Sequence, residues 1–415
     1  MKRLLSFFFV VFLTCLSWQS SWAQTYTLLL KGGHVIDAKN NIDGIMDIAI
    51  QGDTIVRVAE NIPEGQAEQV VDVSGLYVTP GLIDIHGHNF FGTEQDAYLS
   101  NSFTALPPDG FTFRVGVTTI VDAGGAGWKN FATFKAQTID HSKTRVLAFL
   151  NIVGGGMKGG PYEQNLNDMD GKMTGMVVQQ NPEVIGIKVA HYAGPEWKPV
   201  EEAVKAGEMA GAPVMIDFGG NLPPLPLDTL LLEKLRPGDI FTHCFAHIPG
   251  RTPIVNERGK VRPYVYEAQK KGIIFDVGHG GGSFLFRQAI PALKEGFRPN
   301  TISTDLHTGS MNAGMKDQLN VMSKLLNMEM SLSEVIEAST WKPAQVIQQE
   351  DLGHLSEGAV ADIAVFDLQE GEFGFIDSGG YRMEGNQKLE CELTIRAGKV
   401  VYDLNGISRP PWLVE

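Results

Sequence analysis

The sequence has little cysteine, no extended basic run and no serine-hydrolase motif. Only three of its 415 residues are cysteine, and 48 acidic residues outnumber 34 basic ones, giving a formal net charge of −14 at pH 7. Nucleic-acid binding depends on clustered lysine and arginine that contact phosphates, so this charge balance argues against a nucleic-acid partner. The chain has no Gly-x-Ser-x-Gly motif that would support a serine nucleophile.

Cysteine gives no reason to expect a disulfide framework. Two cysteines, Cys244 and Cys391, lie beyond the N-terminal segment. A chain of this size can bury a core large enough to fold without cross-links. Cys244 directly follows His243, a candidate metal ligand, and should point to the opposite face of its strand. We therefore predict no structural disulfide.

A long hydrophobic run occurs at the N-terminus. Two basic residues precede an almost wholly apolar stretch from Leu4 to Leu16, and Ser21-Trp22-Ala23 supplies small residues at a cleavage position after Ala23. The run is too short for a membrane span. We predict a signal peptide over residues 1–23, an exported mature chain without a stable membrane span, and a periplasmic location in a Gram-negative source. An uncleaved anchor and a lipoprotein cut before Cys15 are the alternatives.

The middle of the chain alternates apolar, strand-like runs with helical or glycine-rich connections. Such repeated strand-then-helix units predict a parallel sheet, and eight of them predict a closed (β/α)8 TIM barrel, here over residues 78–353. The segments 24–77 and 354–415 contain short strands separated by glycine turns, and neither is large enough for a good core alone. We predict that both ends form one small β-sandwich, so the fold class is α/β. The eight runs are Leu82–His86, Thr118–Asp122, Arg145–Ile152, Val184–Val189, Pro213–Phe218, Asp239–Cys244, Gly272–Val277 and Thr301–Asp305.

Ionisable side chains recur at the carboxyl ends of these runs, where TIM barrels place their chemistry. His86 and His88 are two residues apart, so in a strand both can approach one metal ion from the same face. Burying a charge is costly unless it is paired or bound to a metal, so repeated charges at one end of apolar strands are hard to explain by packing. The sequence therefore predicts a metal site. The candidate residues are His86, His88, Lys188, Asp217, His243, His279 and Asp305.

These residues lie in motifs that resemble those of the amidohydrolase superfamily of binuclear metal hydrolases, and the deacetylase-like, dihydroorotase-like branch is the most similar. The resemblance implies that His86 and His88 bind the more buried metal ion, that Lys188 is carboxylated and bridges two ions, and that His243 binds the second. It also implies a histidine where this chain has Asp217, a residue that can still serve as a zinc ligand. The matching motifs are Pro80-Gly81-Leu82-Ile83-Asp84-Ile85-His86-Gly87-His88, Gly116-Val117-Thr118-Thr119, Thr242-His243-Cys244, Ser303-Thr304-Asp305-Leu306-His307 and Gly358-Ala359-Val360-Ala361-Asp362-Ile363.

The predicted activity is hydrolysis of an acyl amide or ester of a small molecule, as in a deacetylase or aminoacylase, with one or two Zn²⁺ ions per chain. In this scheme metal-bound hydroxide attacks the carbonyl, and Asp305 binds metal and acts as general base and then general acid. His279 is predicted to contact the substrate, or else to have a structural role. A cyclic-amide hydrolase of the dihydroorotase or hydantoinase type is the first alternative, and a non-catalytic binding protein on a degenerate barrel is the second. A homo-oligomer is possible.

Overall fold

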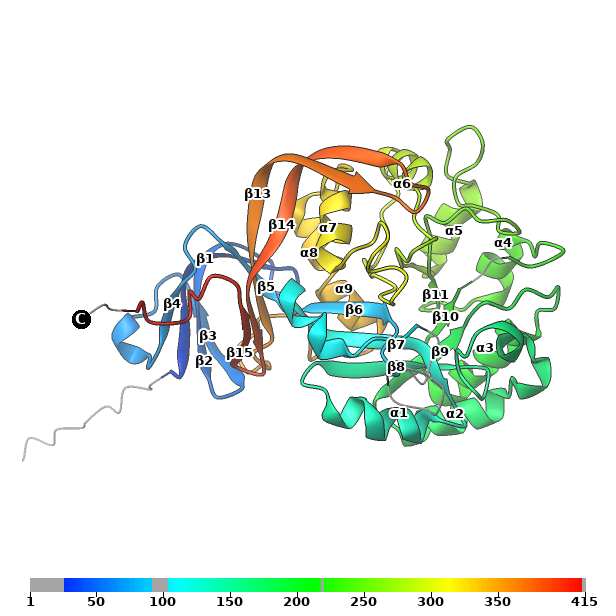
Figure 1. Ribbon diagram of the computed structural model, residues 1–415, viewed down its shortest axis with the longest axis horizontal. Coiled ribbons are helices and arrows are strands. Elements are labelled where there is room, and N and C mark those ends of the chain that lie inside the picture. The colour runs from blue at the N-terminus through cyan, green and yellow to red at the C-terminus, as the bar shows by residue number, and fades with distance from the viewer. Residues whose placement is uncertain (1–25, 92–103, 218–219, 413–415) are drawn as a thin grey trace, which may run out of the picture.

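The computed structural model describes residues 26–91, 104–217 and 220–412 (Figure 1). The predicted export signal lies outside the described residues. Among those residues, no helix has the length and apolar character needed to cross a membrane. Two sheets organise the chain: one carries the two chain ends, and the other carries the residues predicted to bind metal.

Strands from both ends of the chain share one eight-stranded sheet. Hydrogen bonds join them in the order β15-β14-β13-β5-β1-β2-β3, with β4 paired to β1. The connection is β5, which pairs in parallel with β1 and antiparallel with β13. The chain ends therefore combine as expected, but in one continuous sheet where the sequence predicted the two sheets of a sandwich. The strands are β1 (Leu28–Asp37), β2 (Ile42–Gln51), β3 (Thr54–Ala59), β4 (Val70–Asp72), β5 (Tyr77–Pro80), β13 (Ile363–Ile376), β14 (Arg382–Arg396) and β15 (Lys399–Asp403).

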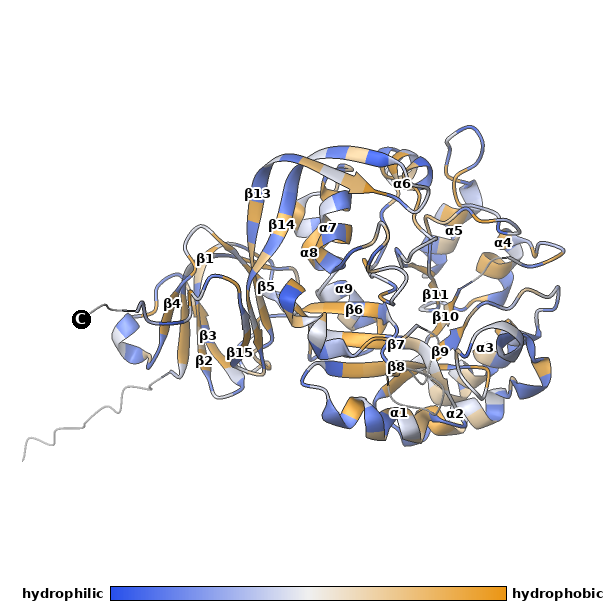
Figure 2. Cartoon of the chain, in the orientation of Figure 1, coloured by the Kyte–Doolittle hydropathy of each residue, from blue (hydrophilic) through white to orange (hydrophobic). Residues whose placement is uncertain are grey.

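The second sheet has seven parallel strands in strict chain order, from β6 to β12. Side chains of β6 to β9 are buried almost throughout, as expected for parallel strands covered on both faces. Figure 2 shows these strands as hydrophobic, whereas the surrounding helices carry both hydrophobic and hydrophilic residues. The strands are β6 (Leu82–Gly87), β7 (Val117–Gly127), β8 (Arg145–Asn151), β9 (Val184–Val189), β10 (Val214–Ile216), β11 (Ile240–Phe241) and β12 (Ile274–Phe275).

The eighth predicted strand, residues 301–305, does not form a regular strand. Thr301 makes an isolated parallel bridge to Asp276 beyond β12, and Leu306 makes another to Gly87 at the end of β6. The segment thus lies between the two edge strands of the curled sheet and contacts both. Asp305 has φ 54°, a left-handed value incompatible with a continuing strand, which explains why the predicted element is replaced by single bridges.

Helices follow most of the parallel strands and pack around them (Figure 1). Glycine in the left-handed conformation ends two of them, Gly211 after α3 (φ 67°) and Gly272 after α5 (φ 100°). The helices are α1 (Phe131–Gln137), α2 (Gly171–Gln180), α3 (Lys198–Ala210), α4 (Leu227–Thr229), α5 (Pro263–Lys271), α6 (Phe286–Lys294), α7 (Gln318–Leu326), α8 (Leu332–Glu337) and α9 (Trp341–Val346).

The long hairpin of β13 and β14 leaves the terminal sheet and arches over α7 and α8 towards α6 (Figure 1). Near its middle, the Leu389 amide donates to Ser323 Oγ on α7 at 3.0 Å. At its tip, the Asp377 carboxylate accepts the Phe286 amide at 3.0 Å, and the Ser378 amide donates to the Phe284 carbonyl at 2.8 Å. The C-terminal sequence therefore supports the segment that follows Val277, and that segment passes through the candidate site.

Candidate metal centre

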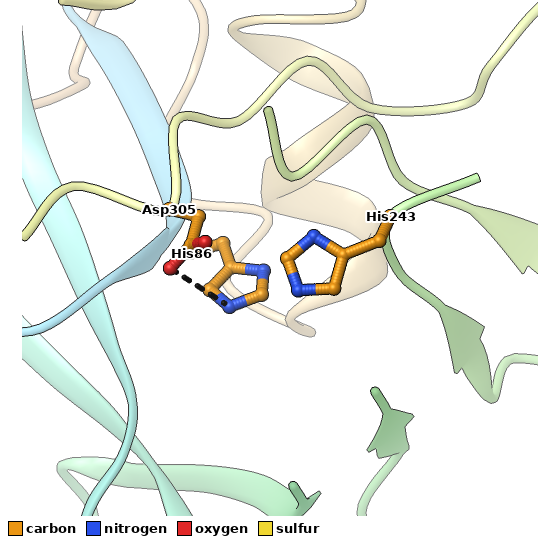
Figure 3. Close-up of side chains that lie close together, drawn as sticks. All are labelled: His86, His243 and Asp305. Atoms are coloured by element: carbon orange, nitrogen blue, oxygen red, sulfur yellow. Dashed lines mark ion pairs between the residues drawn. The ribbon is translucent and has the colours of Figure 1, made fainter. Parts of the chain in front are cut away.

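Three buried side chains converge beyond the carboxyl ends of the parallel strands. His86, at the end of β6, His243, after β11, and Asp305, in the eighth run, each offer one ligand atom, and these atoms all lie within 4.8 Å of one another. Figure 3 shows the three side chains meeting from different elements, with His86 between the other two. His86 Nε2 lies 3.7 Å from Asp305 Oδ1. His243 lies 157 positions after His86, and Asp305 lies 62 positions after His243, so the fold brings together residues that are far apart in the chain.

His86 is held so that one ring nitrogen remains free. Its Nδ1 lies 2.9 Å from Thr242 Oγ1, and that hydroxyl donates its only hydrogen to Asp276 Oδ2 at 2.7 Å. The hydroxyl oxygen must therefore accept from His86 Nδ1–H, which leaves the Nε2 lone pair facing the site. Burial, together with the positive charge of Lys188, lowers the pKa of His86 to about 3. The neutral imidazole that metal binding requires is the stable form here.

Lys188, on β9, is completely buried and lies next to that free nitrogen. Its Nζ is 3.0 Å from His86 Nε2 and 3.6 Å from Met215 Sδ. A Cβ at Gly124 would come within 2.8 Å of Lys188 Cγ, so glycine at this position makes room for the lysine stem. Burial lowers the pKa of Lys188, although nearby carboxylates, Asp217 first among them, oppose the shift.

Asp305 lies close to histidines on both sides of its carboxylate. Its Oδ1 lies 2.8 Å from His88 Nε2, and its Oδ2 is 3.9 Å from His307 Nε2. Burial by itself would raise the pKa of Asp305, but the hydrogen bond from His88 and the charges of the neighbouring histidines hold this pKa far below its usual range. The carboxylate is therefore ionised at neutral pH and available as a ligand.

A second group of donors forms around Asp217 and His243. Asp217 Oδ2 is 3.3 Å from His243 Nε2, and His243 Nδ1 lies 2.5 Å from the Gly278 carbonyl, to which it donates. Burial would raise the pKa of Asp217, but His243, with Lys188 and His191, holds this pKa well below its usual range. Asp217 is thus placed next to His243 and is ionised, as a ligand at this position must be.

Two glycines let the chain pass between these ligands. Gly278 and Gly280 have φ values of 46° and 55°, and a Cβ on either would collide with the site. At Gly278 it would lie 2.4 Å from Thr242 Oγ1, and at Gly280 it would lie 2.3 Å from Asp305 Oδ2. Glycine is required here by both backbone conformation and space.

His279, between these glycines, is held by contacts inside the protein. Its ring is completely buried and stacks on Phe284, with centroids 4.4 Å apart and planes 9° apart. Nδ1 lies 2.9 Å from the Gly280 carbonyl and Nε2 lies 2.7 Å from Lys324 Nζ. Because both ring nitrogens already have partners inside the protein, the geometry supports the structural alternative for this residue.

The donor set fits divalent metal ions of the zinc type. His86 and His243 each use Nδ1 in a supporting hydrogen bond and turn Nε2 towards a carboxylate or the lysine, the arrangement typical of metal-binding histidines. Nitrogen and carboxylate oxygen are ligands that Zn²⁺ accepts. His88 Nδ1 is buried without a hydrogen-bond partner, and its Nε2 faces Asp305. The candidate residues are therefore brought together, His279 excepted as a direct contact.

Several supporting residues were not predicted from the sequence. Asp276 is completely buried and accepts hydrogen bonds from the hydroxyls of Thr242, Thr301 and Ser303. It lies inside the predicted run Gly272–Val277, where a charge in an apolar strand was an available signal. Lys324 lies on α7 among apolar residues, which is a weaker signal, and only the folded chain shows that it contacts His279.

Comparison with known proteins agrees with this geometry. The Amidohydrolase family matches residues 286–401. A deacetylase of Agrobacterium fabrum is 34% identical over 343 residues, covering 80% of this chain and 81% of the relative. A deacetylase of Brucella anthropi is also 34% identical, over 382 residues that cover 90% of this chain and 92% of the relative.

Two solved structures are similar to this chain in fold and in sequence. An adenine deaminase has a TM-score of 0.80 and 29% sequence identity, covering 91% of this chain and 100% of its own. A dihydroorotase has a TM-score of 0.78 and 30% identity, covering 91% of this chain and 99% of its own. The chain belongs to the amidohydrolase superfamily, in its deacetylase-like and dihydroorotase-like branch, and is a hydrolase that acts on C–N bonds.

Proposed function

We propose that this protein is a zinc-dependent deacylase that hydrolyses an acyl amide or ester of a small molecule. The observation that carries the proposal is the convergence of His86, His243 and Asp305, whose ligand atoms lie within 4.8 Å of one another in a buried position. Relatives named deacetylases, matched over most of their length, support the acyl substrate class.

In this proposal His86, His88 and Asp305 hold one metal ion, Asp217 and His243 hold a second, and Lys188 lies between them. When bound, such ions acidify water to a pKa of about 7 and polarise a carbonyl oxygen. His86 and His243 each use Nδ1 in a hydrogen bond to a fixed acceptor, so Nε2 is the nitrogen that would face the ion, and His88 turns its Nε2 towards Asp305.

Asp305 is the proton carrier in this scheme. Its Oδ1 lies 2.8 Å from His88 Nε2, among the candidate ligand atoms, so Oδ2 is the atom left to take a proton from the attacking water and deliver it to the leaving nitrogen or oxygen. No serine or cysteine nucleophile is needed.

We further propose that Lys188 is carboxylated. In this reaction the neutral amine attacks carbon dioxide, a C–N bond forms, and one proton leaves, giving a carbamate with two oxygen ligands. The buried position of Lys188 and its lowered pKa support the neutral amine that this step requires. Metal content that rises when bicarbonate is added to the wild-type protein, but not to Lys188→Met, would support the carbamate; equal responses would contradict it.

A cyclic-amide hydrolase remains the second candidate because a dihydroorotase matches the fold at a TM-score of 0.78 with 30% identity. The two readings differ in the bond that is cleaved. N-acyl amino acids and O-acyl hydroxy acids test the first, whereas dihydroorotate and substituted hydantoins test the second.

The experiment combines metal analysis with this substrate panel. Protein expressed with added zinc should hold about two ions per chain and turn over one of the acyl compounds, and Asp305→Asn should lower turnover by roughly 10²–10⁴-fold with the fold retained. Turnover of cyclic amides alone would favour the second candidate. A protein that takes up no metal under these conditions would be a binding protein on a degenerate barrel.

We also propose that the mature enzyme is exported, which the basic start and the apolar run from Leu4 to Leu16 support. Mature protein isolated from its source should then begin at Gln24. Any other N-terminus contradicts this cleavage site.

A further inference from the structure

The second metal position has one imidazole fewer than the superfamily resemblance implies, because Asp217 stands after β10. Yet a further imidazole lies beside this carboxylate. Asp217 Oδ2 is 3.6 Å from His191 Nε2 and 3.3 Å from His243 Nε2. One carboxylate oxygen is therefore shared by two ring nitrogens, one from each side chain.

The His191 ring is oriented in the way that the other ligand histidines are. Its Nδ1 lies 2.6 Å from Glu163 Oε2, so Nδ1–H donates to the carboxylate and Nε2 is the nitrogen turned towards Asp217. Glu163 is only 1% exposed, and its other oxygen accepts the Gly159 amide at 2.9 Å. A carboxylate that is buried and fixed in this way sets the ring orientation and raises the basicity of the other nitrogen. Burial would lower the pKa of His191, but Glu163 and Asp217 raise it to about 9, so an ion that binds Nε2 takes the place of the proton there.

The backbone at His191 is also held in an unusual conformation. Its φ is 53°, close to the values of His243 (55°) and Asp305 (54°), two residues of the metal centre. Non-glycine residues rarely adopt this conformation, and those that do are often found at functional sites. Gln164 holds the turn, because its Nε2 donates to the His191 carbonyl at 2.7 Å and its Oε1 accepts the Ala193 amide at 2.9 Å.

Glu163 and Gln164 are adjacent residues, and together they fix the ring and the backbone of His191. The His191 side chain is 52% exposed, so these contacts, and not burial, set its orientation. Neither the tight support nor the left-handed backbone is needed for a histidine that merely sits on the surface.

We propose that His191 is the second imidazole ligand of the second metal ion, in place of the histidine that the end of β10 lacks, and that Glu163 is its positioning residue. This inference rests on the proposed metal-dependent function and adds a ligand to it. It explains how the site can keep a histidine pair, His191 and His243, although Asp217 occupies the usual place of one of them.

The test measures zinc binding directly. Wild-type protein and His191→Gly are dialysed against buffers of defined free zinc, and bound zinc per chain is counted. Glycine tolerates the positive φ, so the turn should survive the substitution. We expect the wild type to bind two ions, and His191→Gly to keep the first ion and bind the second about 10–100-fold more weakly. Added imidazole should restore the second ion by filling the space of the missing ring.

Two further variants make the result specific. Glu163→Gln keeps the imidazole but weakens its orientation, so the second ion should bind more weakly than in the wild type. His34→Ala removes another imidazole bonded to a carboxylate, since His34 Nε2 lies 2.6 Å from Asp43 Oδ1 in the terminal sheet, and should leave both ions in place.

Two unaltered ions in His191→Gly would overturn the inference and leave the proposed function standing, with His191 as a substrate contact or surface residue. No ion in the wild type would overturn both. Loss of both ions in His191→Gly, without rescue by imidazole, would mean that the residue supports the fold of the site and is not a ligand.

Discussion

At the scale of single residues, the chemistry of the site depends on which nitrogen of each histidine is free. Three different acceptors determine this: the Thr242 hydroxyl for His86, the Gly278 carbonyl for His243, and the Glu163 carboxylate for His191. Each acceptor is distant in the chain from the histidine that it orients, so the ring orientations are fixed by the fold and not by local sequence.

Asp276 provides a test of this support. It fixes the Thr242 hydroxyl that holds His86, so Asp276→Asn should weaken metal binding by about 10–100-fold, measured by competition with a chromogenic chelator. The matched control is Asp239→Asn. Asp239 is equally buried but accepts from Arg236 and the Val214 amide, away from the candidate ligands, and should lower stability without changing metal affinity. Equal metal affinities in wild type and Asp276→Asn would contradict this role.

Lys324 predicts a particular pH dependence of stability. Burial lowers the pKa of Lys324 to about 7 in the folded protein, against an ordinary value of 10.5 in the unfolded chain. Below pH 7 both states are protonated and the cost of burying the charge is fully present. Between about pH 7 and 10.5 the unfolded chain binds more protons, so stability rises with pH by up to about 1.4 kcal/mol per unit.

Lys324→Met lacks this contribution. Urea unfolding of both proteins at pH 7 and pH 9 should therefore show the wild type gaining stability relative to the variant as pH rises. A difference that is constant with pH would mean that Lys324 stays charged in the folded protein over this range and that its pKa is not lowered.

The candidate ligand residues could be named from the sequence, whereas the residues that support them could not. A charge at the end of an apolar strand, as at His86 or Lys188, has few explanations apart from a site. The role of Lys324 depends on a contact with His279 that is 45 positions away in the chain, and no local pattern predicts such a contact. The sequence also could not show that both ring nitrogens of His279 have partners inside the protein, and for that reason a substrate contact was predicted for this residue.

At the scale of elements, the segment 278–280 connects the two halves of the site. It runs beside the eighth predicted strand, with the His279 amide donating to the Ser303 carbonyl at 3.2 Å and the Gly280 amide to the Thr304 carbonyl at 2.9 Å. Its glycines leave no space between the backbone and the ligand side chains. Asp305 can therefore keep its position only because residue 280 is a glycine.

Gly280→Ala should disturb the site more than the same substitution at a nearby glycine. The new Cβ would lie 2.3 Å from Asp305 Oδ2 on a backbone with φ 55°, so we expect weaker metal binding and a lower melting temperature. Gly282→Ala, in the same loop, meets no atom within 4 Å and should match the wild type in both measurements. Identical behaviour of the two variants would show that the loop adapts.

The order of the parallel strands could be predicted from the alternation of apolar runs and helices, but their lengths could not. The last three named strands shrink to two or three residues, and the eighth run forms only bridges. Polar side chains and left-handed residues such as His243 and Asp305 interrupt the pairing where the site begins. The residues of the candidate site thus make these strands shorter than the apolar pattern predicts.

At the scale of the whole molecule, the donors come from several separate parts of the chain, so a bound ion should stabilise the folded state as a whole. Ions that bind the folded chain alone add about 2.7 kcal/mol at a free concentration of 100 times Kd. Chelation should lower the melting temperature, and zinc should restore it. A melting temperature that neither chelation nor zinc changes would argue against a metal centre.

The pairing of β5 with β13 has a consequence for biosynthesis. Pro80 of β5 pairs with Ile363 of β13, 283 residues later in the chain, and β5 leads directly into β6 and the His-x-His motif. During translation the first ligand strand therefore has no partner on that side. The sheet that supports this strand can therefore be completed only after β13 has been made.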